Sequence, residues 1–495
     1  MSEEREYRNI FKTTFLFGFV QVFNILLKVG LNKSVAILLG ANGMGVIGLF
    51  NSSISFLQTG AGLGISQSAV RDISEAYASH DIDRFSYIIA VTKRVVLFTS
   101  LFGGIITIVL SPFLSCWIFG NQAYTISFVF ISIVVTLNIL SDGWLAVLKG
   151  MRQLRALAKA SMIGSAVGLF SAVPCYYLWG ESGIVPSLIV ASLSALYFSH
   201  FFVKRMRYKN ISLSFRDAII CSFPMVKMGG ALMLVSFAII LFNLIIATFI
   251  RANGSLSDVG YYNAGSTIVT SYFGIVITAM STDYYPRISA VYKDNKKLSE
   301  EVNKQSEVGL VLIFPLVILF VFLAPIFISI LYSSDFAAAV NYTDYAMLGT
   351  ILIICSHFLG MILLVKQQSR VFLLSMFGQR IFLIFVYMFG YKYGSLTGLG
   401  IAYVITGLSD IILMSYVMRR MYNIKLSKRV YCIMSLILFT TILSIVLRVI
   451  DDLLLRYSLG MVPFCYSLFF SYTFMKKKMN VSFSSFIYKV LRRKS

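Results

Sequence analysis

Charged side chains are scarce in this chain, and their scarcity excludes a soluble protein. Of 495 residues only 13% are Asp, Glu, Lys or Arg, whereas 58% are hydrophobic, and the mean hydropathy is +0.81. A soluble domain carries about one quarter charged residues. A chain with so few has to use lipid as its main solvent. The sequence therefore predicts an all-α polytopic membrane protein.

Clusters of metal-ligating or nucleophilic residues are lacking as well. The three histidines stand far apart, and the six cysteines lie singly in or beside apolar runs, without the spacing of a metal site. We expect no metal and no cofactor, and we interpret the cysteines as packing residues. The first apolar run has no small-residue cleavage site, so we expect it to remain as a transmembrane helix.

Apolar runs of about 20 residues, long enough to cross a bilayer, are present fourteen times. They predict helices near 10–31, 44–66, 85–111, 123–147, 158–178, 184–203, 225–250, 259–284, 306–332, 342–365, 370–390, 396–418, 430–449 and 457–475. The first of these helices can continue to Leu39 as one long helix.

The positive charges are distributed unevenly along the chain. A net charge of +22 would indicate nucleic acid binding in a soluble protein, but here it follows the positive-inside rule. With the N-terminus in the cytoplasm, the outer loops carry only Lys33, Arg251, Lys392, Arg448 and Arg456. We therefore expect a multi-pass protein of the bacterial inner membrane with both termini cytoplasmic, and no nucleic acid partner. The outer loops are too short for a catalytic domain, so we do not expect an enzyme.

The chain also resembles itself. The segment "ANGMGVIGLFN" (41–51) returns as "ANGSLSDVGYYN" (252–263), and five further short matches keep the same order and a similar spacing. This pattern predicts two six-helix lobes, 1–212 and 213–428, related by a pseudo-two-fold axis along the membrane normal. Two extra helices (429–475) and a basic cytoplasmic tail (476–495) follow them.

Polar residues form stripes on several predicted helices. Gln21, Asn24 and Lys28 share one face of the first helix, Asn51 belongs to a stripe on the second, and Asn263 and Thr270 to one on the eighth. A polar stripe in a membrane faces the bundle interior or a water-filled cavity. Small polar residues can also simply hold helices together, so a cavity lining and a packing role both remain open.

Cations within the predicted spans are harder to explain by packing. A Lys or Arg at mid-bilayer costs about 3 kcal/mol or more. Lys28, Arg94 and Arg380 are the best candidates for buried cations, whereas Lys33 lies near the outer end of its helix. The first three have no cationic counterpart in the other repeat, which favours a function over a role in the shared fold. A cationic cavity suits an anionic cargo such as a phosphate or diphosphate.

Acidic residues within the spans are fewer. Asp142, Asp283 and Asp410 are candidates for coupling to H⁺ or Na⁺, and each can equally form an ion pair with a nearby Lys or Arg.

The segments "SVAILLGANGMGVIGLFN", "VGYYNAGSTIV" and "DYYPRIS" resemble the polysaccharide-exporter branch of the multidrug/oligosaccharidyl-lipid/polysaccharide (MOP) flippase superfamily. Within it the chain is most similar to O-antigen flippases (Wzx, or O-antigen translocases). The resemblance implies a V-shaped bundle of two lobes. It also implies transfer of undecaprenyl-diphosphate-linked oligosaccharide from the cytoplasmic to the periplasmic leaflet, by alternating access, for lipopolysaccharide biosynthesis.

The family is thought to bind the diphosphate with cations of a central cavity, and the matching candidates here are Lys28, Lys33, Arg94 and Arg380. A polysaccharide polymerase and a chain-length regulator are the protein partners that this resemblance implies.

Two other transporters of the same superfamily remain as alternatives. A drug or small-cation antiporter should have buried acidic residues, whereas the deep charges here are mainly basic. A lipid II flippase also carries a diphosphate cargo, so it stays open. A membrane enzyme, such as a polysaccharide polymerase or ligase, is disfavoured by the short outer loops.

Overall fold

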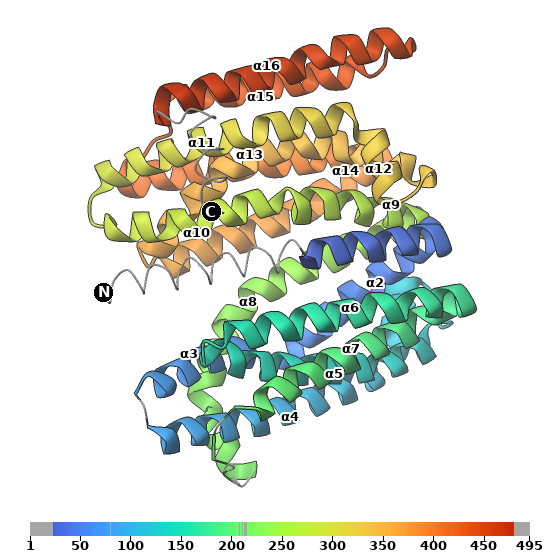
Figure 1. Cartoon of the computed structure of the whole chain (residues 1–495), viewed down its shortest axis with the longest axis vertical. Helices are drawn as coiled ribbons and strands as arrows, with labels where there is room; N and C mark the ends of the chain where they lie inside the picture. Colours follow the sequence, from blue (N-terminus) through green and yellow to red (C-terminus); the bar gives the residue numbers. More distant parts are fainter. Residues whose placement is uncertain (1–22, 80, 207, 210, 212–214, 480–495) are drawn as a thin grey trace, which may run out of the picture. The chain divides into compact units, whose positions relative to one another are not determined.

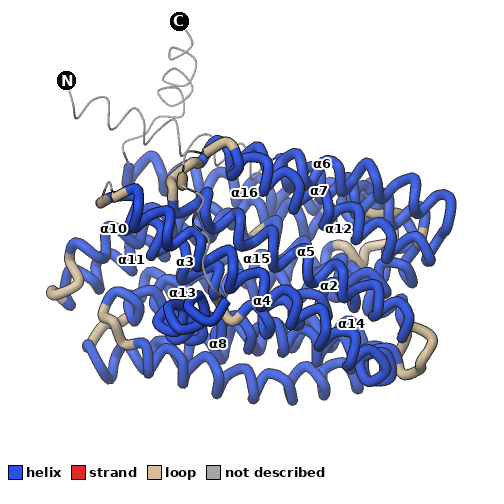
Figure 2. The backbone as a smooth tube through the Cα atoms, turned by 90° about the horizontal axis from the view of Figure 1, so that it is seen from below, coloured by secondary structure: helices blue, strands red, loops and turns tan. Residues whose placement is uncertain are grey.

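A computed structural model describes residues 23–479 except 80, 207, 210 and 212–214. Across these residues the chain is helical and contains no strand (Figure 2). The fold is therefore all-α, as predicted, because a backbone in lipid has to satisfy its hydrogen bonds within each segment.

Within the described residues, ten helices are long and apolar enough to cross a membrane. Two of them, Leu154–Lys204 and Arg370–Tyr422, each contain two of the predicted spans. Of the other two predicted spans, the first begins outside the described residues. The second corresponds to α2 (Gly40–Gly62), whose Asn, Ser, Gln and Gly residues lower its hydropathy. This agrees with the fourteen spans predicted from the sequence.

The chain separates into two compact units, Met1–Asn263 with Leu331–Asp335, and Ala264–Ile330 with Phe336–Ser495. The first unit contains the helix of residues 23–38 and the beginning of α9 (Leu256–Thr267). Its other helices are α2, α3 (Ile65–Ala78), α4 (Ile82–Leu114), η1 (Ser115–Phe119), α5 (Thr125–Gly150), α6 (Leu154–Trp179), η2 (Gly180–Gly183), α7 (Ile184–Lys204) and α8 (Phe215–Asn253). Within it α5 packs against α4 and α7, and α6 packs against α7 (Figure 1).

The second unit contains the remaining helices. They are the end of α9, η3 (Ile268–Tyr272), α10 (Gly274–Ala290), α11 (Asn295–Phe322), α12 (Ala324–Leu331), η4 (Ser334–Ala338), α13 (Ala339–Val365), α14 (Ser369–Tyr422), α15 (Lys428–Leu447) and α16 (Leu453–Met479). The chain bends within α14 at Ser395, which divides it into two helices. Packing within this unit centres on α13, which contacts α11 and α14, while α15 and α16 pack against α11. The predicted lobe boundaries 212 and 428 and the two-fold relation of the lobes remain predictions.

The two repeated segments meet within the first unit, where α2 crosses the beginning of α9. A Cβ on Gly45 would lie 2.0 Å from the Leu256 carbonyl oxygen, and a Cβ on Gly260 would lie 2.1 Å from the Ala41 carbonyl oxygen. Ala41 and Leu256 are 215 residues apart, as are Gly45 and Gly260. The contact is therefore reciprocal, and it is possible only because glycine has no side chain and lets two helix backbones touch.

Within the second unit, a buried ion pair joins α15 to α13. Arg448, at the C-terminal end of α15, donates to both carboxylate oxygens of Asp344 on α13, with 2.8 Å from Nη1 to Oδ1. Its Nη1 also donates to the Val321 carbonyl of α11 at 3.1 Å. The side chains of Arg448 and Asp344 are only 17% and 5% exposed. Arg448, which the sequence places in an outer loop, thus ties together three helices.

Candidate functional site

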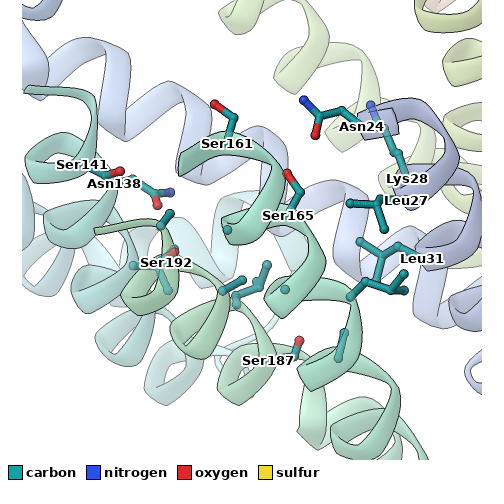
Figure 3. Close-up of a pocket in the computed structure, with 18 of the residues that line it drawn as sticks. Asn24, Leu27, Lys28, Leu31, Asn138, Ser141, Ser161, Ser165, Ser187 and Ser192 are labelled. Carbon is teal, nitrogen blue, oxygen red and sulfur yellow. The ribbon is translucent and has the colours of Figure 1, made fainter. Parts of the chain in front are cut away.

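A cavity of about 610 Å³ lies inside the first unit. The helix of residues 23–38 forms one wall, and α2, α5, α6 and α7 form the others (Figure 3). Its polar lining consists of Asn24, Lys28, Asn51, Asn138, Ser141, Ser161, Ser165, Ser187 and Ser192. We call this space the Lys28 pocket. Tyr176, two glycines and leucine, isoleucine, valine and alanine side chains line the rest of it.

Among the described residues that line the Lys28 pocket, Lys28 is the one that carries a charge. In the part of the chain that the structure describes, its ammonium group has neither a hydrogen bond nor an ion pair, and its side chain remains accessible. Asn24 lies one turn earlier on the same helix, and its Oδ1 is buried without a partner in that same part of the chain. The pocket therefore presents an uncompensated positive charge beside free hydrogen-bonding capacity.

Hydroxyl groups from three helices complete the polar lining. Ser187 of α7 donates to the Tyr176 hydroxyl of α6 at 3.1 Å, and the hydroxyls of Ser141 and Ser199 are 3.3 Å apart. Ser161 and Ser165 follow each other by one turn on α6, and both line the pocket (Figure 3). Such groups both donate and accept hydrogen bonds, as sugar hydroxyls do.

The predicted polar stripes converge only in part. Asn24, Lys28 and Asn51 line the same pocket, whereas Gln21 lies outside the described residues. Lys33 lies on the helix of Lys28 but is not among the lining residues. Asn263 packs its amide group against Gly48, where α9 crosses α2. Sequence reasoning missed Asn138, Ser161 and Ser165, although the one-turn spacing of the two serines was a usable signal.

Arg94 lies in another pocket of the first unit, together with Lys93 and Lys209. The structure thus does not bring Arg94 and Lys28 into one site.

Asp142 forms a polar contact of its own in the first unit. The side-chain Nε2 of Gln58 on α2 donates to the carboxylate of Asp142 on α5 at 2.6 Å. The pair lines a small cavity of about 110 Å³ with Thr59, Gln67 and Ser236. A carboxylate held by an amide and not by a cation keeps the capacity to bind a proton.

The second unit holds the remaining predicted residues. Asp410 accepts a hydrogen bond from Gln379 and lies close enough to Arg380 for an electrostatic interaction. Asp283 instead forms an ion pair with Arg287, 3.0 Å long, and Arg287 also contacts Glu301 at 2.8 Å. Asp283 thus adopts the ion-pair alternative of the two expected for it.

Thr270 belongs to the π-helical turn η3. Its hydroxyl donates to the Ser266 carbonyl at 2.7 Å, so it is satisfied within its own helix.

The chain is similar to known proteins. A family model described as "Polysaccharide biosynthesis protein" matches residues 34–341. The lipid III flippases of Escherichia coli (strain K12) and Shigella flexneri are each 20% identical over 363 residues, which cover 71% of this chain and 85% of theirs.

Two solved structures show a similar fold. The lipid II flippase MurJ in an inward closed conformation has a TM-score of 0.71 at 12% identity, covering 95% of this chain and 100% of its own. An inward-facing multidrug resistance MATE family transporter of the MOP superfamily has a TM-score of 0.66 at 14% identity, covering 84% of this chain and 96% of its own.

Proposed function

Because the chain belongs to the polysaccharide biosynthesis protein family and has the fold of the MOP superfamily, we propose that it is a flippase for a lipid-linked oligosaccharide. The proposed cargo is an undecaprenyl-diphosphate-linked repeat unit of O-antigen or a similar surface polysaccharide. It moves from the cytoplasmic to the periplasmic leaflet of the inner membrane by alternating access. The similarity to lipid III flippases supports a lipid-linked cargo.

The Lys28 pocket is the observation that carries the proposal. Its single ammonium group is free to form charge-assisted hydrogen bonds with a diphosphate oxygen. Asn24, Asn51 and the serine hydroxyls supply neutral donors and acceptors for the remaining phosphate oxygens or for sugar hydroxyls. One flexible point charge gives modest affinity, which suits a cargo that has to be released on the other side.

The positive charge of the Lys28 pocket also favours an anionic cargo over a cationic drug. A drug-cation antiporter needs a carboxylate at its binding site, and no Asp or Glu lines the Lys28 pocket in the part of the chain that the structure describes. In the second unit, Arg380 beside Asp410 is the second proposed contact for the cargo's diphosphate. A polymerase and a chain-length regulator are the proposed downstream partners.

Substitution of Lys28 tests the proposal. Lys28→Ala removes one charge-assisted contact, which should cost roughly 1.5–3 kcal/mol of cargo binding and strongly reduce glycan export. Lys28→Arg should retain part of the activity and Lys28→Glu none. The measurement is complementation of a flippase-deficient strain, with protein amount in the membrane determined in parallel.

Lys392→Ala is the matched control, because Lys392 is exposed on α14 and rests on Tyr393. Full complementation by Lys28→Ala would remove Lys28 from the site and the main support for an anionic cargo.

A further inference from the structure

A second cationic pocket lies between α4, α5 and the segment that follows α7. Its volume is about 360 Å³, and we call it the Lys93 pocket. The lining residues are Ser86, Ile89, Ala90, Lys93, Arg94, Leu97, Leu140, Trp144, Tyr208, Lys209 and Ile211. None of them is acidic, and the proposed flippase function does not use this pocket.

Aromatic groups fix Lys93 in place. Its ammonium donates to the Tyr208 hydroxyl at 3.0 Å and lies 4.4 Å from the centre of the Tyr208 ring. The centre of the Trp144 ring is 5.1 Å from the same ammonium group. These cation–π contacts hold the charge without neutralising it.

The other two cations differ in their partners. Lys209 is neutralised by Asp83, 2.6 Å away, and its backbone N–H donates to Ser86 at 2.9 Å, which docks this segment on α4. Arg94 is exposed, and among the described residues its guanidinium has no hydrogen bond or ion pair. Lys93 and Arg94 therefore leave two positive charges uncompensated in one pocket.

The sequence of α4 and η1 fixes the depth of the Lys93 pocket in the membrane. Residues 95–119 contain no Asp, Glu, Lys or Arg. At 1.5 Å per residue this segment is about 37 Å long, more than the roughly 30 Å of the hydrocarbon core. Lys93 and Arg94 stand directly before it. The pocket thus lies at headgroup level, where Trp and Tyr are also enriched.

An exposed apolar stripe begins at the pocket and runs along α4 into the span. Leu97 is 40% exposed, and Leu101 and Ile105, at one-turn intervals, are 52% and 60% exposed. This stripe can receive acyl chains whose headgroup is held at Lys93 and Arg94.

We propose that the Lys93 pocket binds an anionic phospholipid of the bilayer, with its phosphate on Lys93 and Arg94 and its acyl chains on the exposed stripe of α4. A soluble phosphate compound would gain nothing from that stripe. The assignment also explains why Arg94 lies apart from the Lys28 pocket.

Native mass spectrometry of the purified full chain tests the proposal. The added probes are phosphatidylglycerol, phosphatidylcholine, soluble glycerol phosphate and undecaprenyl phosphate. We expect phosphatidylglycerol to bind in preference to phosphatidylcholine. Arg94→Gln and Lys93→Gln/Arg94→Gln should weaken phosphatidylglycerol binding, the double variant by about tenfold, because charge-assisted contacts to the phosphate are lost.

Arg419→Gln/Arg420→Gln is the matched control, since it removes another adjacent basic pair, which is exposed at the end of α14. It should bind phosphatidylglycerol within twofold of the wild type. Arg94→Gln removes no hydrogen bond or ion pair within the described residues, so it stays informative if the double variant misfolds.

Three outcomes overturn the proposal. Equal loss in the control pair would show unspecific charge attraction. Equally tight binding of glycerol phosphate would show a soluble-phosphate site. Much tighter, Arg94-dependent binding of undecaprenyl phosphate would assign the pocket to the cargo. The Lys28 complementation result is independent of all three.

Discussion

Removing Arg448 should destabilise the protein strongly, because Asp344 would then remain buried without its counter-charge. We consider the change Arg448→Met, which keeps much of the length and apolar character of the side chain. The variant loses both hydrogen bonds to the carboxylate and the one to the Val321 carbonyl. With a side chain only 5% exposed, Asp344 cannot recover these interactions from water.

The expected loss follows from two estimates that agree. Breaking a buried pair by removing one partner typically costs about 3–5 kcal/mol. Alternatively the Asp344 carboxylate takes up a proton in the folded variant. For a carboxyl group with the ordinary pKa of aspartate, protonation at pH 7 costs about 4 kcal/mol of folding free energy. The double variant Asp344→Leu/Arg448→Met has no buried charge left, so it should recover most of the stability.

The measurement is the free energy of unfolding in mixed micelles, by SDS titration followed by circular dichroism. Arg456→Met is the control, because Arg456 rests on Tyr457 at 5.3 Å and should contribute about 1 kcal/mol or less. The reasoning fails if the free energy of unfolding of Arg448→Met lies within about 1 kcal/mol of the wild-type value. It also fails if the two single changes add without coupling in the double variant.

Two further substitutions test other contacts. Gly45→Val and Gly260→Val each place a side chain against a carbonyl oxygen about 2 Å away. Each change alone should therefore abolish export and lower the amount of folded protein. Gly62→Ala should do neither, because a Cβ at Gly62 has no neighbouring atom within 4 Å. Asp142→Asn keeps an acceptor for Gln58 but cannot bind a proton. It should therefore leave folding intact and abolish proton-driven flipping in vesicles with an imposed proton gradient. Unchanged gradient-dependent flipping would limit Asp142 to a structural role.

The helices could be predicted from the sequence because hydropathy is a local property. Apolar runs gave the spans that the structure describes, and the helix begun by the first run extends through residue 38. The three-residue and four-residue spacing of polar side chains also placed Asn24 and Lys28 on one face, and both line the Lys28 pocket. Their binding role stays a prediction.

Other parts of the site depend on contacts that no local pattern contains. Nothing in α5 marks Asn138 as facing a cavity, because only its neighbours α6 and α7 define that side of the helix. Arg448 follows an apolar run like any loop cation, and its partner Asp344 is 104 residues away. Likewise, the position of a basic residue along a span indicates its depth in the membrane but not which cavity its side chain enters. The sequence therefore could not show that Arg94 and Lys28 line different pockets.

Where Gly45 and Gly260 lie, the crossing of α2 and α9 brings backbone atoms into direct contact, and this determines what can influence that contact. Carbonyl groups and Cα hydrogens do not titrate, so neither pH nor ionic strength changes the strength of the contact between Gly45 and Gly260. Its energy comes from short-range dispersion and weak Cα–H···O contacts, which vanish within an ångström or two of separation. The contact between Gly45 and Gly260 is therefore lost as soon as the two helices separate by that distance. A proton or an ion that drives transport has to act on groups elsewhere, such as Asp142, which accepts from Gln58, and Asp410, which accepts from Gln379.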